Sequence, residues 1–276
     1  MGASRGAAQP RPLTIGFAPF ENQAEVLRKA RPVVDVLTKA LNRPVRPFVA
    51  GDYPAIVEAL KGGKLDVAFL SPAAMIMAEK VAGARVLLKS VYKGRSAYYS
   101  AIITRTDSPY KTLADLKGHT FAFVDPGSTS GGVYPKLMLM KAGLNPDHDF
   151  SHLIYAGGHD AAVLAVLNHK VDAASTFAND NHGDDVPWKH ILGKDADKIR
   201  AIAYSQPIPN GAIAVSKSLD AETTAKVRQT FLDLGKSVEG RAHLSRFYLI
   251  ESFAPATSAD YDPVREAFAR VGLRVK

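Results

Sequence analysis

The stretch TFAFVDPGSTSGGVYPKLMLM, from Thr120 to Met140, decides how the rest of the chain can be interpreted. Its apolar run at 120–124 predicts a buried strand, and residues 133–140 have the composition of a helix. Three hydroxyl side chains at 128–130 and two glycines at 131–132 join them. The free amides of a first helical turn point toward a bound anion, and the helix dipole favours its negative charge. The stretch therefore predicts a site for a tetrahedral oxyanion.

A simpler interpretation of the same turn stays open. Ser128 or Ser130 could serve only as the N-cap of the helix, since a serine hydroxyl readily accepts a hydrogen bond from an early helical amide. A cap needs one hydroxyl, whereas this turn has three, and the surplus favours the anion site. The turn lacks the Gly-Lys-Ser/Thr element of nucleotide-binding loops, so it is not a phosphate loop of that type.

The composition is that of an ordinary globular chain. It has 276 residues, of which 46% are hydrophobic and 22% charged, enough for one large domain or two lobes. No run of about 18 apolar residues is present, which argues against a membrane span. The absence of cysteine excludes thiolate chemistry, cysteine-bound metal and disulfides. The net charge of +8 is spread over scattered Lys and Arg, so it indicates a mild bias toward anionic ligands and not a nucleic-acid surface.

The N-terminal stretch MGASRGAAQPR, residues 1–11, is rich in Gly, Ala, Pro and Arg, and we expect it to be disordered. It has no apolar core of the kind that a signal peptide needs, so we expect a signal peptide to be absent from this sequence.

Short apolar strands alternate with helical segments along the chain, which predicts an α/β fold with largely parallel sheets. The predicted strands are 13–17, 45–49, 66–70, 85–88, 98–104, 120–124, 151–155, 171–175, 201–204 and 211–215. The predicted helices with clear bounds are 53–61, 131–142, 159–168, 220–238, 240–248 and 262–271. A further helical segment is expected to end near Leu41, with an interruption at Pro32, and another to begin at Ser71-Pro72.

The chain contains a weak internal repeat. A helix, a tight turn and a Lys-x-Asp-x-Ala strand occur once in each half, and the spacing from Tyr53 to Asp66 equals that from His159 to Asp172. Chance similarity between two amphipathic helices is the alternative. The repeat otherwise predicts two similar lobes, with Tyr53 and His159 at equivalent helix N-termini. Such N-termini lie at the carboxyl edge of a parallel sheet, where open α/β folds bind ligands.

We expect one lobe to comprise residues 12–103 together with 211–276, and the other to comprise residues 104–210. The chain then crosses twice between the lobes, at hinges near 103–106 and 204–210. The second hinge contains two prolines, which break any helix. A ligand would lie in the cleft, and closure would trap it.

Three further side chains are expected at this cleft. His159 follows a glycine pair that favours close backbone approach, and its imidazole would offer the anion a donor with partial or full positive charge. Tyr53, at the matching helix start of the other lobe, and Tyr98, on a strand, would add phenolic donors. For each tyrosine, a role in the core or at its rim is the alternative.

Catalytic and metal-binding arrangements are not evident. His182, Asp184, Asp185 and His190 surround Trp188 in the sequence, but their spacing matches no metal motif, and the segment has the composition of a polar loop. The serines at 128–130 lack the Gly-x-Ser-x-Gly frame of a nucleophile elbow. We therefore predict no catalytic residue, no metal and no cofactor, and a protein that is not an enzyme.

Five segments occur in an order that resembles a known family. They are GDYPAI at 51–56, KLDVAFLSP at 64–72, YYS at 98–100, DPGSTSG at 125–131 and AGGH at 156–159. Over about residues 12–255 the chain resembles the periplasmic phosphonate/phosphite-binding proteins of ABC importers. The resemblance implies a type II periplasmic binding protein of α/β class, with two similar lobes, a ligand cleft and two crossovers.

The resemblance also implies roles for particular residues. Ser128, Thr129, Ser130 and His159 would grip the phosphonate oxygens, and Tyr53 and Tyr98 would complete the pocket from the other lobe. The implied partner is an ABC permease in the membrane, the implied place is the periplasm, and a monomer is expected.

Two departures from the family bear on the ligand. Members that bind 2-aminoethylphosphonate carry acidic residues for its ammonium group, and here those positions are Asn179 and Gly211. A buried ammonium without a carboxylate is costly, so we expect an amine-free ligand such as phosphite, methylphosphonate or another small phosphonate. Asp180, one residue along, could restore an anionic partner. Ser71 stands where relatives often have glycine and would add a hydroxyl near the anion.

Other functions stay open at this stage. The same fold could bind 2-aminoethylphosphonate, phosphate or a sulfonate. An enzyme on a similar two-lobed fold would need a nucleophile or an acid–base pair at the cleft, and the sequence shows only oxyanion donors. A pair of binding lobes can also serve a sensory receptor.

Overall fold

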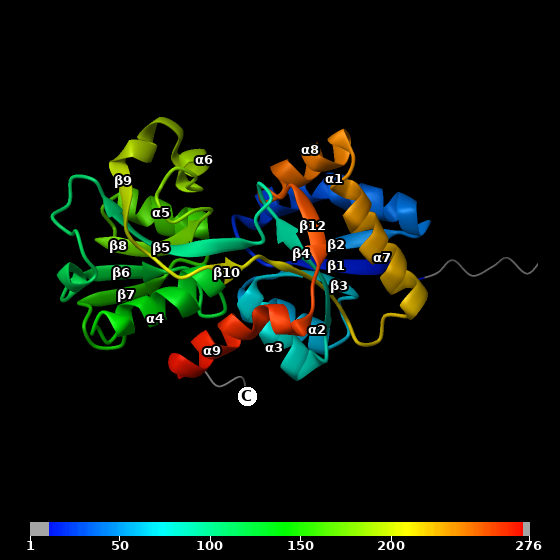
Figure 1. The fold of residues 1–276 in the computed structure, drawn as a ribbon, viewed down its shortest axis with the longest axis horizontal. Helices are drawn as coiled ribbons and strands as arrows, with labels where there is room; N and C mark the ends of the chain where they lie inside the picture. Colours follow the sequence, from blue (N-terminus) through cyan, green and yellow to red (C-terminus); the bar gives the residue numbers. More distant parts are fainter. Residues whose placement is uncertain (1–10, 273–276) are drawn as a thin grey trace, which may run out of the picture.

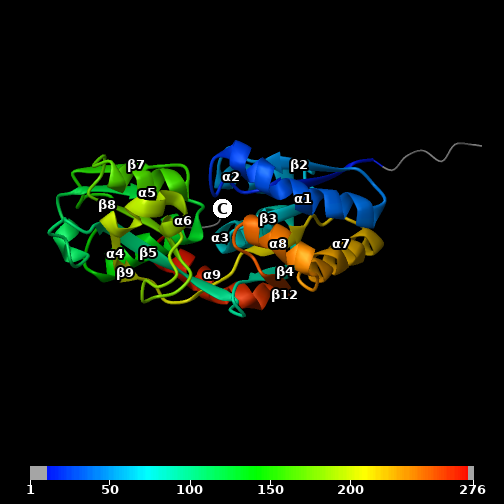
Figure 2. The same ribbon diagram turned by 90° about the horizontal axis from the view of Figure 1, so that it is seen from above.

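The computed structural model describes residues 11–272, which form two α/β lobes lying side by side. Figure 1 shows the first lobe, which contains the N-terminal strand, on the right and the second lobe on the left. Figure 2 shows the same arrangement from above. The predicted disorder of residues 1–11 falls outside the described residues except at Arg11. The guanidinium of Arg11 forms an ion pair with Asp66 at 2.5 Å.

The first lobe has a six-stranded sheet in the order β12-β4-β11-β3-β1-β2. Its strands are β1 (Leu13–Phe17), β2 (Val45–Val49), β3 (Val67–Leu70), β4 (Arg85–Val91), β11 (Ala212–Val215) and β12 (Ser252–Pro255). Its helices are α1 (Gln23–Leu41), α2 (Tyr53–Lys61), α3 (Pro72–Ala82), α7 (Ala221–Leu234) and α8 (Val238–Arg246). A hydrophobic core lies on each face of the sheet, one under α1, α7 and α8 and the other under α2 and α3.

The second lobe has a sheet in the order β10-β5-β8-β6-β7, with β9 also paired to β5. Its strands are β5 (Ala97–Arg105), β6 (Thr120–Phe123), β7 (His152–Tyr155), β8 (Ala173–Ala178), β9 (Ile199–Tyr204) and β10 (Ile208–Pro209). Its helices are α4 (Tyr134–Lys141), α5 (His159–Leu167) and α6 (Trp188–Leu192), with short turns η1 (Ala114–Leu116), η2 (Thr129–Val133) and η3 (Gly193–Lys198). Helices α5 and α6 pack on one core and α4 on the other.

Both sheets are mixed, so the prediction of largely parallel sheets is wrong. β1 runs parallel to β2 and β3, and β6 runs parallel to β7 and β8. β11 pairs antiparallel with β3 and β4, and β5 pairs antiparallel with β8 and β9. β5 and β11 are the strands by which the chain enters one lobe after leaving the other. Each of the two therefore runs opposite to the parallel strands of the sheet that it joins.

Helix α1 continues through Pro32, where the sequence predicted an interruption. Proline removes one backbone hydrogen bond and strains the preceding turn. The apolar face of α1 outweighs this cost, because Val26, Ala30, Val33 and Leu37 are fully buried against the sheet. The side chain of Asn22 caps the first turn.

The first passage between the lobes lies earlier than predicted. β5 pairs with β8 and β9 over 99–105, so the expected hinge at 103–106 lies inside a sheet and is wrong. The chain leaves β4 at Val91 and enters β5 at Ala97, which places the passage at 92–96. Residues 97–103 consequently belong to the sheet of the second lobe, and the predicted boundary at residue 103 is wrong for the same reason.

The second passage lies at Asn210 and Gly211, between β10 and β11, at the end of the predicted hinge. The side-chain amide of Asn210 donates to the carbonyl oxygens of Ser90 and Arg95 at 2.9 and 3.1 Å. These bonds tie the two passages together on one side of the molecule.

The last elements of the chain contact both lobes. After η4 (Ser258–Tyr261), α9 (Asp262–Arg270) packs against α3 of the first lobe and against α4 of the second. Figure 1 shows α9 running beneath both lobes. Among the described residues 11–272, none of the helices combines the length and hydropathy needed to cross a membrane.

The internal repeat corresponds to a repeated architecture. The order β3-β1-β2 in the first lobe matches β8-β6-β7 in the second, with α2 and α5 in equivalent places. The carboxylate of Asp66 accepts from the amide of Thr14 at 2.9 Å, and that of Asp172 accepts from the amide of Thr120 at 2.9 Å. Each repeat aspartate therefore fixes the start of β1 or β6, the middle one of the three parallel strands in its own lobe.

Candidate ligand-binding site

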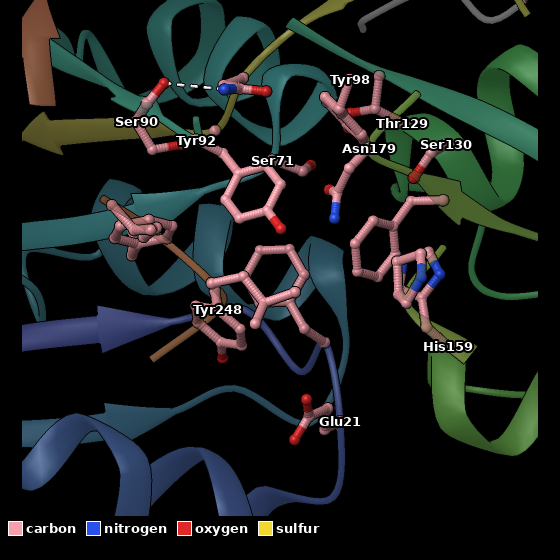
Figure 3. Close-up of a pocket in the computed structure, with 18 of the residues that line it drawn as sticks. Glu21, Ser71, Ser90, Tyr92, Tyr98, Thr129, Ser130, His159, Asn179 and Tyr248 are labelled. Carbon is pink, nitrogen blue, oxygen red and sulfur yellow. Dashed lines mark hydrogen bonds between the residues drawn. The ribbon is translucent and has the colours of Figure 1, made fainter. Parts of the chain in front are cut away.

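A cavity of about 190 Å³ lies between the lobes, at the carboxyl ends of their parallel strands. Figure 3 shows part of its lining. The cavity brings together all of the side chains predicted for the site: Tyr53, Ser71, Tyr98, Ser128, Thr129, Ser130, His159 and Asn179. Most of them are buried, with Ser128, Thr129, Ser130 and His159 at most 3% exposed. Hydrogen bonds made inside this cavity are thus shielded from water.

The oxyanion turn, residues 125–133, connects the end of β6 to α4. Its helical part, η2, is a π-helical turn, in which the amide of Val133 donates to the carbonyl of Ser128 at 3.0 Å. A Cβ atom on Gly131 would lie 2.4 Å from the Cβ of Val124, and one on Gly132 would lie 2.2 Å from the carbonyl oxygen of Asp125. The two glycines therefore let the turn fold tightly onto its own strand.

Two of the three hydroxyl groups of the oxyanion turn are positioned by backbone amides. The Oγ of Ser128 accepts from the amide of Gly131 at 3.1 Å, and the Oγ1 of Thr129 accepts from the amide of Ala73 at 2.8 Å. Because each oxygen is used as an acceptor, its proton stays available to donate. Ser128 is the N-cap that the simpler interpretation proposed, and capping does not consume its proton.

His159 is the first residue of α5, after Gly157, whose φ of +84° is a conformation suited to glycine. The Nδ1 of His159 lies 3.1 Å from the Oγ1 of Thr176. Burial lowers the pKa of His159 to about 3, so the imidazole is neutral near pH 7. The ring therefore carries no full positive charge near pH 7 in this form of the protein, and the N–H of the neutral imidazole, with its partial positive charge, is the donor that it offers.

The two predicted tyrosines come from different lobes. Tyr53 begins α2 in the first lobe, and its hydroxyl is buried with no hydrogen-bond partner among the described residues. Tyr98 lies on β5, so the expectation that it belongs to the lobe opposite the oxyanion turn is wrong. Burial raises the pKa of both phenols well above the ordinary value. Both tyrosines therefore remain protonated donors.

Ser71 is the N-cap of α3, where its Oγ accepts from the amide of Ala74 at 3.2 Å. The same hydroxyl donates to the carbonyl oxygen of Gly127 in the second lobe at 3.3 Å. This bond uses the proton that the sequence analysis assigned to the anion. Ser71 is therefore at the cavity, with its donor directed at the opposite lobe.

Asn179 lines the cavity at the end of β8, and its amide donates to Asp185 at 3.0 Å. Asp180 does not line the cavity, because its carboxylate accepts from the backbone amides of His182, Gly183 and Asp185. These bonds fix a loop and lower the pKa of Asp180 against the effect of burial. Asp180 consequently does not replace the acid missing at position 179.

Direct contacts join the lobes around the cavity. Besides the bonds from Ser71 and to Thr129, the amide of His159 donates to the carbonyl oxygen of Phe20 at 3.2 Å. Lys93, in the first passage, forms an ion pair with Asp185 at 2.7 Å. The structure thus represents a closed arrangement of the lobes.

Comparison with known proteins places this geometry in a family. The profile of the family described as "ABC transporter, phosphonate, periplasmic substrate-binding protein" matches residues 15–261. This chain belongs to that family. Its members are substrate-binding components of transporters, so the predictions of a transport function with a membrane permease, of a periplasmic place and of a protein that is not an enzyme are confirmed at this level.

Curated relatives agree with the family. The chain is 30% identical to the phosphate-import protein PhnD of Mycolicibacterium smegmatis, over 93% of this chain and 84% of the relative. It is also 30% identical to the phosphonates-binding periplasmic protein of Escherichia coli, over 86% of this chain and 70% of the relative.

Solved structures share the fold. The binding protein of an ABC phosphonate transporter from Pseudomonas aeruginosa superposes with a TM-score of 0.87 at 23% identity, covering 96% of this chain and 87% of its own. PhnD1 of Prochlorococcus marinus, solved in complex with methylphosphonate, gives a TM-score of 0.83 at 18% identity, covering 95% and 99%. The predicted type II periplasmic binding-protein fold is confirmed.

The cavity of the binding protein also has a wall that the sequence analysis missed. It includes Phe20, Phe69, Phe177, Tyr248, Leu249 and Ile250. Phe20 follows β1, at the place where the second lobe has its oxyanion turn, so the repeat could have indicated it. Tyr248 and Leu249 come from the turn after α8, and no local motif marks them.

Charged side chains at the cavity are already paired or lie at its rim. Among the described residues, Glu21 is the acidic side chain that lines the cavity, and its carboxylate contacts the ammonium of Lys29 at 2.5 Å. Arg246 and His190 reach the lining from exposed positions. Within residues 11–272 no group of acidic, histidine or cysteine side chains is arranged to hold a metal ion.

Proposed function

We propose that this binding protein captures an amine-free phosphorus oxyanion, a small phosphonate or phosphite, between its lobes. Ser128, Thr129, Ser130 and His159 would donate to the phosphonate oxygens from the second lobe. Tyr98 would donate from the same lobe and Tyr53 from the first. Neutral donors at a helix start suit an anion because they add no charge that must be desolvated.

One observation carries this proposal. The hydroxyl of Tyr53 is buried between the lobes and has no partner among the described residues. A buried donor without a partner costs about 1–3 kcal/mol, so such groups in native proteins call for a partner from outside the chain. The hydroxyl lines the same cavity as the three donors of the oxyanion turn. A bound oxyanion would supply the acceptor that Tyr53 lacks.

The absence of an amine in the ligand is supported by the acidic groups near the cavity. Family members that bind 2-aminoethylphosphonate carry acidic residues at two positions, which in this chain are Asn179 and Gly211. Both of these residues line the cavity. Asp180 is bonded to backbone amides, and Glu21 is paired with Lys29. An ammonium group in this cavity would have to separate the pair at Glu21 or remain without a counter-charge.

Delivery follows from closure of the lobes. We propose that the lobes move as two bodies about 92–96 and 210–211, and that the ligand stabilises the closed form through contacts with both. A monomer would present the closed form to the permease.

A matched pair of ligands tests the proposal. 2-Aminoethylphosphonate and n-propylphosphonate have the same shape, and they differ by an ammonium in place of a methyl group. We expect calorimetric titration to show at least tenfold tighter binding of n-propylphosphonate, which corresponds to about 1.4 kcal/mol. Tighter binding of 2-aminoethylphosphonate would refute the amine-free ligand and assign its ammonium to Glu21.

The same titration with a site variant tests the donors. Ser130→Ala should weaken n-propylphosphonate binding by about tenfold or more, because a hydrogen bond to a charged group is lost. Ser151→Ala, at an exposed position before β7, is the matched control.

Titration of the unaltered protein with two further anions tests the class of ligand. They are phosphate, the ligand named for the M. smegmatis relative, and methanesulfonate. If the protein binds phosphate or methanesulfonate more tightly than every phosphonate, the proposed ligand is wrong.

A further inference from the structure

The cavity is divided into a polar end and an apolar wall. The donors of the oxyanion turn and His159 lie on one side, and Figure 3 shows Tyr248 and Tyr92 across the cavity from His159 and Ser130. Behind Tyr248, aromatic rings from three segments of the first lobe are in contact. The ring of Phe20 lies 4.5 Å from that of Tyr248, and the ring of Phe69 lies 5.8 Å from it. From the second lobe, Phe177 packs against the ring of His159 at 5.0 Å.

The cavity is larger than an oxyanion requires. A cavity of about 150 Å³ lined by leucine, isoleucine and phenylalanine is large enough to bind benzene. The cavity here measures about 190 Å³ and is bounded on its far side by Phe20, Phe69, Tyr248, Leu249 and Ile250. An anion as small as phosphite would leave the aromatic wall without contact. The rings of this wall are apolar, and its buried polar atom is the hydroxyl of Tyr248, which has no hydrogen-bond partner among the described residues.

The backbone holds this wall in an uncommon conformation. Tyr248 and Leu249 have φ values of +61° and +57°, a region that residues with side chains seldom adopt. The amides of Leu249 and Ile250 donate back to the carbonyls of Ser245 and Leu244, both at 3.2 Å, which fixes the turn. The turn directs two adjacent side chains into the cavity, and strain of this kind concentrates at binding sites.

We infer that the wall is a subsite for an uncharged apolar substituent on the ligand, an aryl group or a branched alkyl group of similar size. The inference rests on the proposed function, because the phosphonate head must occupy the donors first. With the head at 128–130, the substituent points across the cavity toward Tyr248 and Phe20. Burial of apolar surface then adds affinity in proportion to the area removed from water.

A charged substituent fits this wall less well. Glu21 is paired with Lys29, and the basic side chains of Lys29 and Arg246 also reach the lining. A quaternary ammonium can bind to aromatic faces without a carboxylate, so charge and shape must be separated by experiment. 2-(Trimethylammonio)ethylphosphonate and 3,3-dimethylbutylphosphonate have the same shape and differ in the charge of the substituent.

The test is calorimetric titration of the protein with methylphosphonate, phenylphosphonate and that matched pair. We expect phenylphosphonate and 3,3-dimethylbutylphosphonate to bind at least tenfold more tightly than methylphosphonate. If methylphosphonate binds and the larger ligands bind more weakly, the subsite is refuted while the proposed function stands. If the trimethylammonio ligand exceeds its neutral counterpart, the substituent is a cation and the inference is wrong. If no phosphonate binds, the proposed function itself fails.

Two variants of one residue test the wall directly. Tyr248→Ala should reduce the preference for phenylphosphonate over methylphosphonate by about tenfold, whereas Tyr248→Phe, which keeps the ring, should retain it. If both variants lose the preference for phenylphosphonate to the same extent, the preference depends on the hydroxyl of Tyr248 and the inference is wrong. Tyr155→Ala, at a tyrosine that is 50% exposed and does not line the cavity, is the matched control. The ligand series on the unaltered protein decides the case if Tyr248→Ala does not fold.

Discussion

At the scale of single residues, the site contains a buried histidine whose ring is neutral near pH 7 in the ligand-free protein. His159 is 3% exposed, and its pKa is lowered to about 3 because burial disfavours the imidazolium. Its Nδ1 faces the hydroxyl of Thr176, which can donate to it and so leave the proton on Nε2. A bound phosphonate would raise the pKa of His159, since a nearby negative charge favours the protonated ring.

The buried histidine should also make stability depend on pH. Its folded pKa of about 3 is below the unfolded value of about 6.5, so the unfolded state binds more protons between those values. The free energy of unfolding should then fall as the pH falls through this window. We expect His159 to account for a loss of about 2 kcal/mol between about pH 7.5 and pH 5. Denaturant unfolding of the ligand-free protein at both pH values measures it.

The comparison with His159→Gln isolates that contribution from those of other groups. The variant should lose about 2 kcal/mol less than the unaltered protein over the same pH range. His148→Gln, at an exposed histidine, is the matched control. An unchanged pH dependence in His159→Gln would show that the buried imidazole is not the group that titrates.

At the scale of elements, the site consists of turns at strand ends whose shape is set by small residues. A Cβ atom on Gly131 would lie 2.4 Å from the side chain of Val124, so Gly131→Ala must displace the oxyanion turn or the end of β6. Overpacking of this kind typically costs about 1–3 kcal/mol, and we expect that loss in the free energy of unfolding. We also expect phosphonate binding to weaken by at least tenfold, since the donors at 128–130 move.

Gly51→Ala is the matched control for Gly131→Ala, because a Cβ atom there meets no atom within 4 Å and the backbone is not in the left-handed region. It should change stability by less than about 0.5 kcal/mol. Wild-type binding by Gly131→Ala, measured in the same titration, would mean that the turn tolerates the shift and that its exact fold is not needed.

The elements that the sequence predicted well are those determined by neighbouring residues. The strand at 120–123, the turn at 125–133 and the helix start at His159 each carry their own signals, namely an apolar run, hydroxyls with glycines, and a glycine pair. The interruption at Pro32 failed because burial of the apolar face of α1 outweighs the local preference of one residue.

The features that the sequence did not predict depend on distant parts of the chain. β5 looks like any other apolar strand, and its membership of the second sheet follows from pairing with β8 and β9, about 70 to 100 residues later. Tyr248 and Leu249 reach the cavity through a turn after α8, and the expected helix at 240–248 instead ends at Arg246. This part of the aromatic wall could therefore be found only from the folded chain, whereas the repeat could have indicated Phe20.

At the scale of the whole molecule, two equivalent lobes contribute different chemistry at equivalent places. The turn after the middle parallel strand carries Phe20 in the first lobe, after β1, and three hydroxyls in the second, after β6. The next helix begins with Tyr53 in one lobe and His159 in the other. The two lobes thus share one backbone arrangement and differ in the side chains at equivalent positions. In the proposed complex, the second lobe would hold the anion and the first would contact its substituent.

Closure of the two lobes brings Gly127 against Tyr53. A Cβ atom on Gly127 would lie 2.8 Å from the Cβ of Tyr53, which belongs to the opposite lobe. Gly127→Ala should therefore oppose the closed form and spare the open one. We expect ligand-free stability close to that of the unaltered protein and phosphonate binding weaker by at least tenfold, since a ligand that favours the closed form must also overcome the clash.

Small-angle X-ray scattering with and without n-propylphosphonate measures closure in this variant. The unaltered protein should become more compact when the ligand is added, and Gly127→Ala should do so only at higher ligand concentration. Gly51→Ala, in the same lobe as Tyr53, should behave as the unaltered protein does. If Gly127→Ala binds and compacts normally, the approach of Gly127 to Tyr53 does not limit closure, and the lobes must meet elsewhere. If it unfolds more readily without ligand, the clash is present in the resting state, and the free protein is already closed.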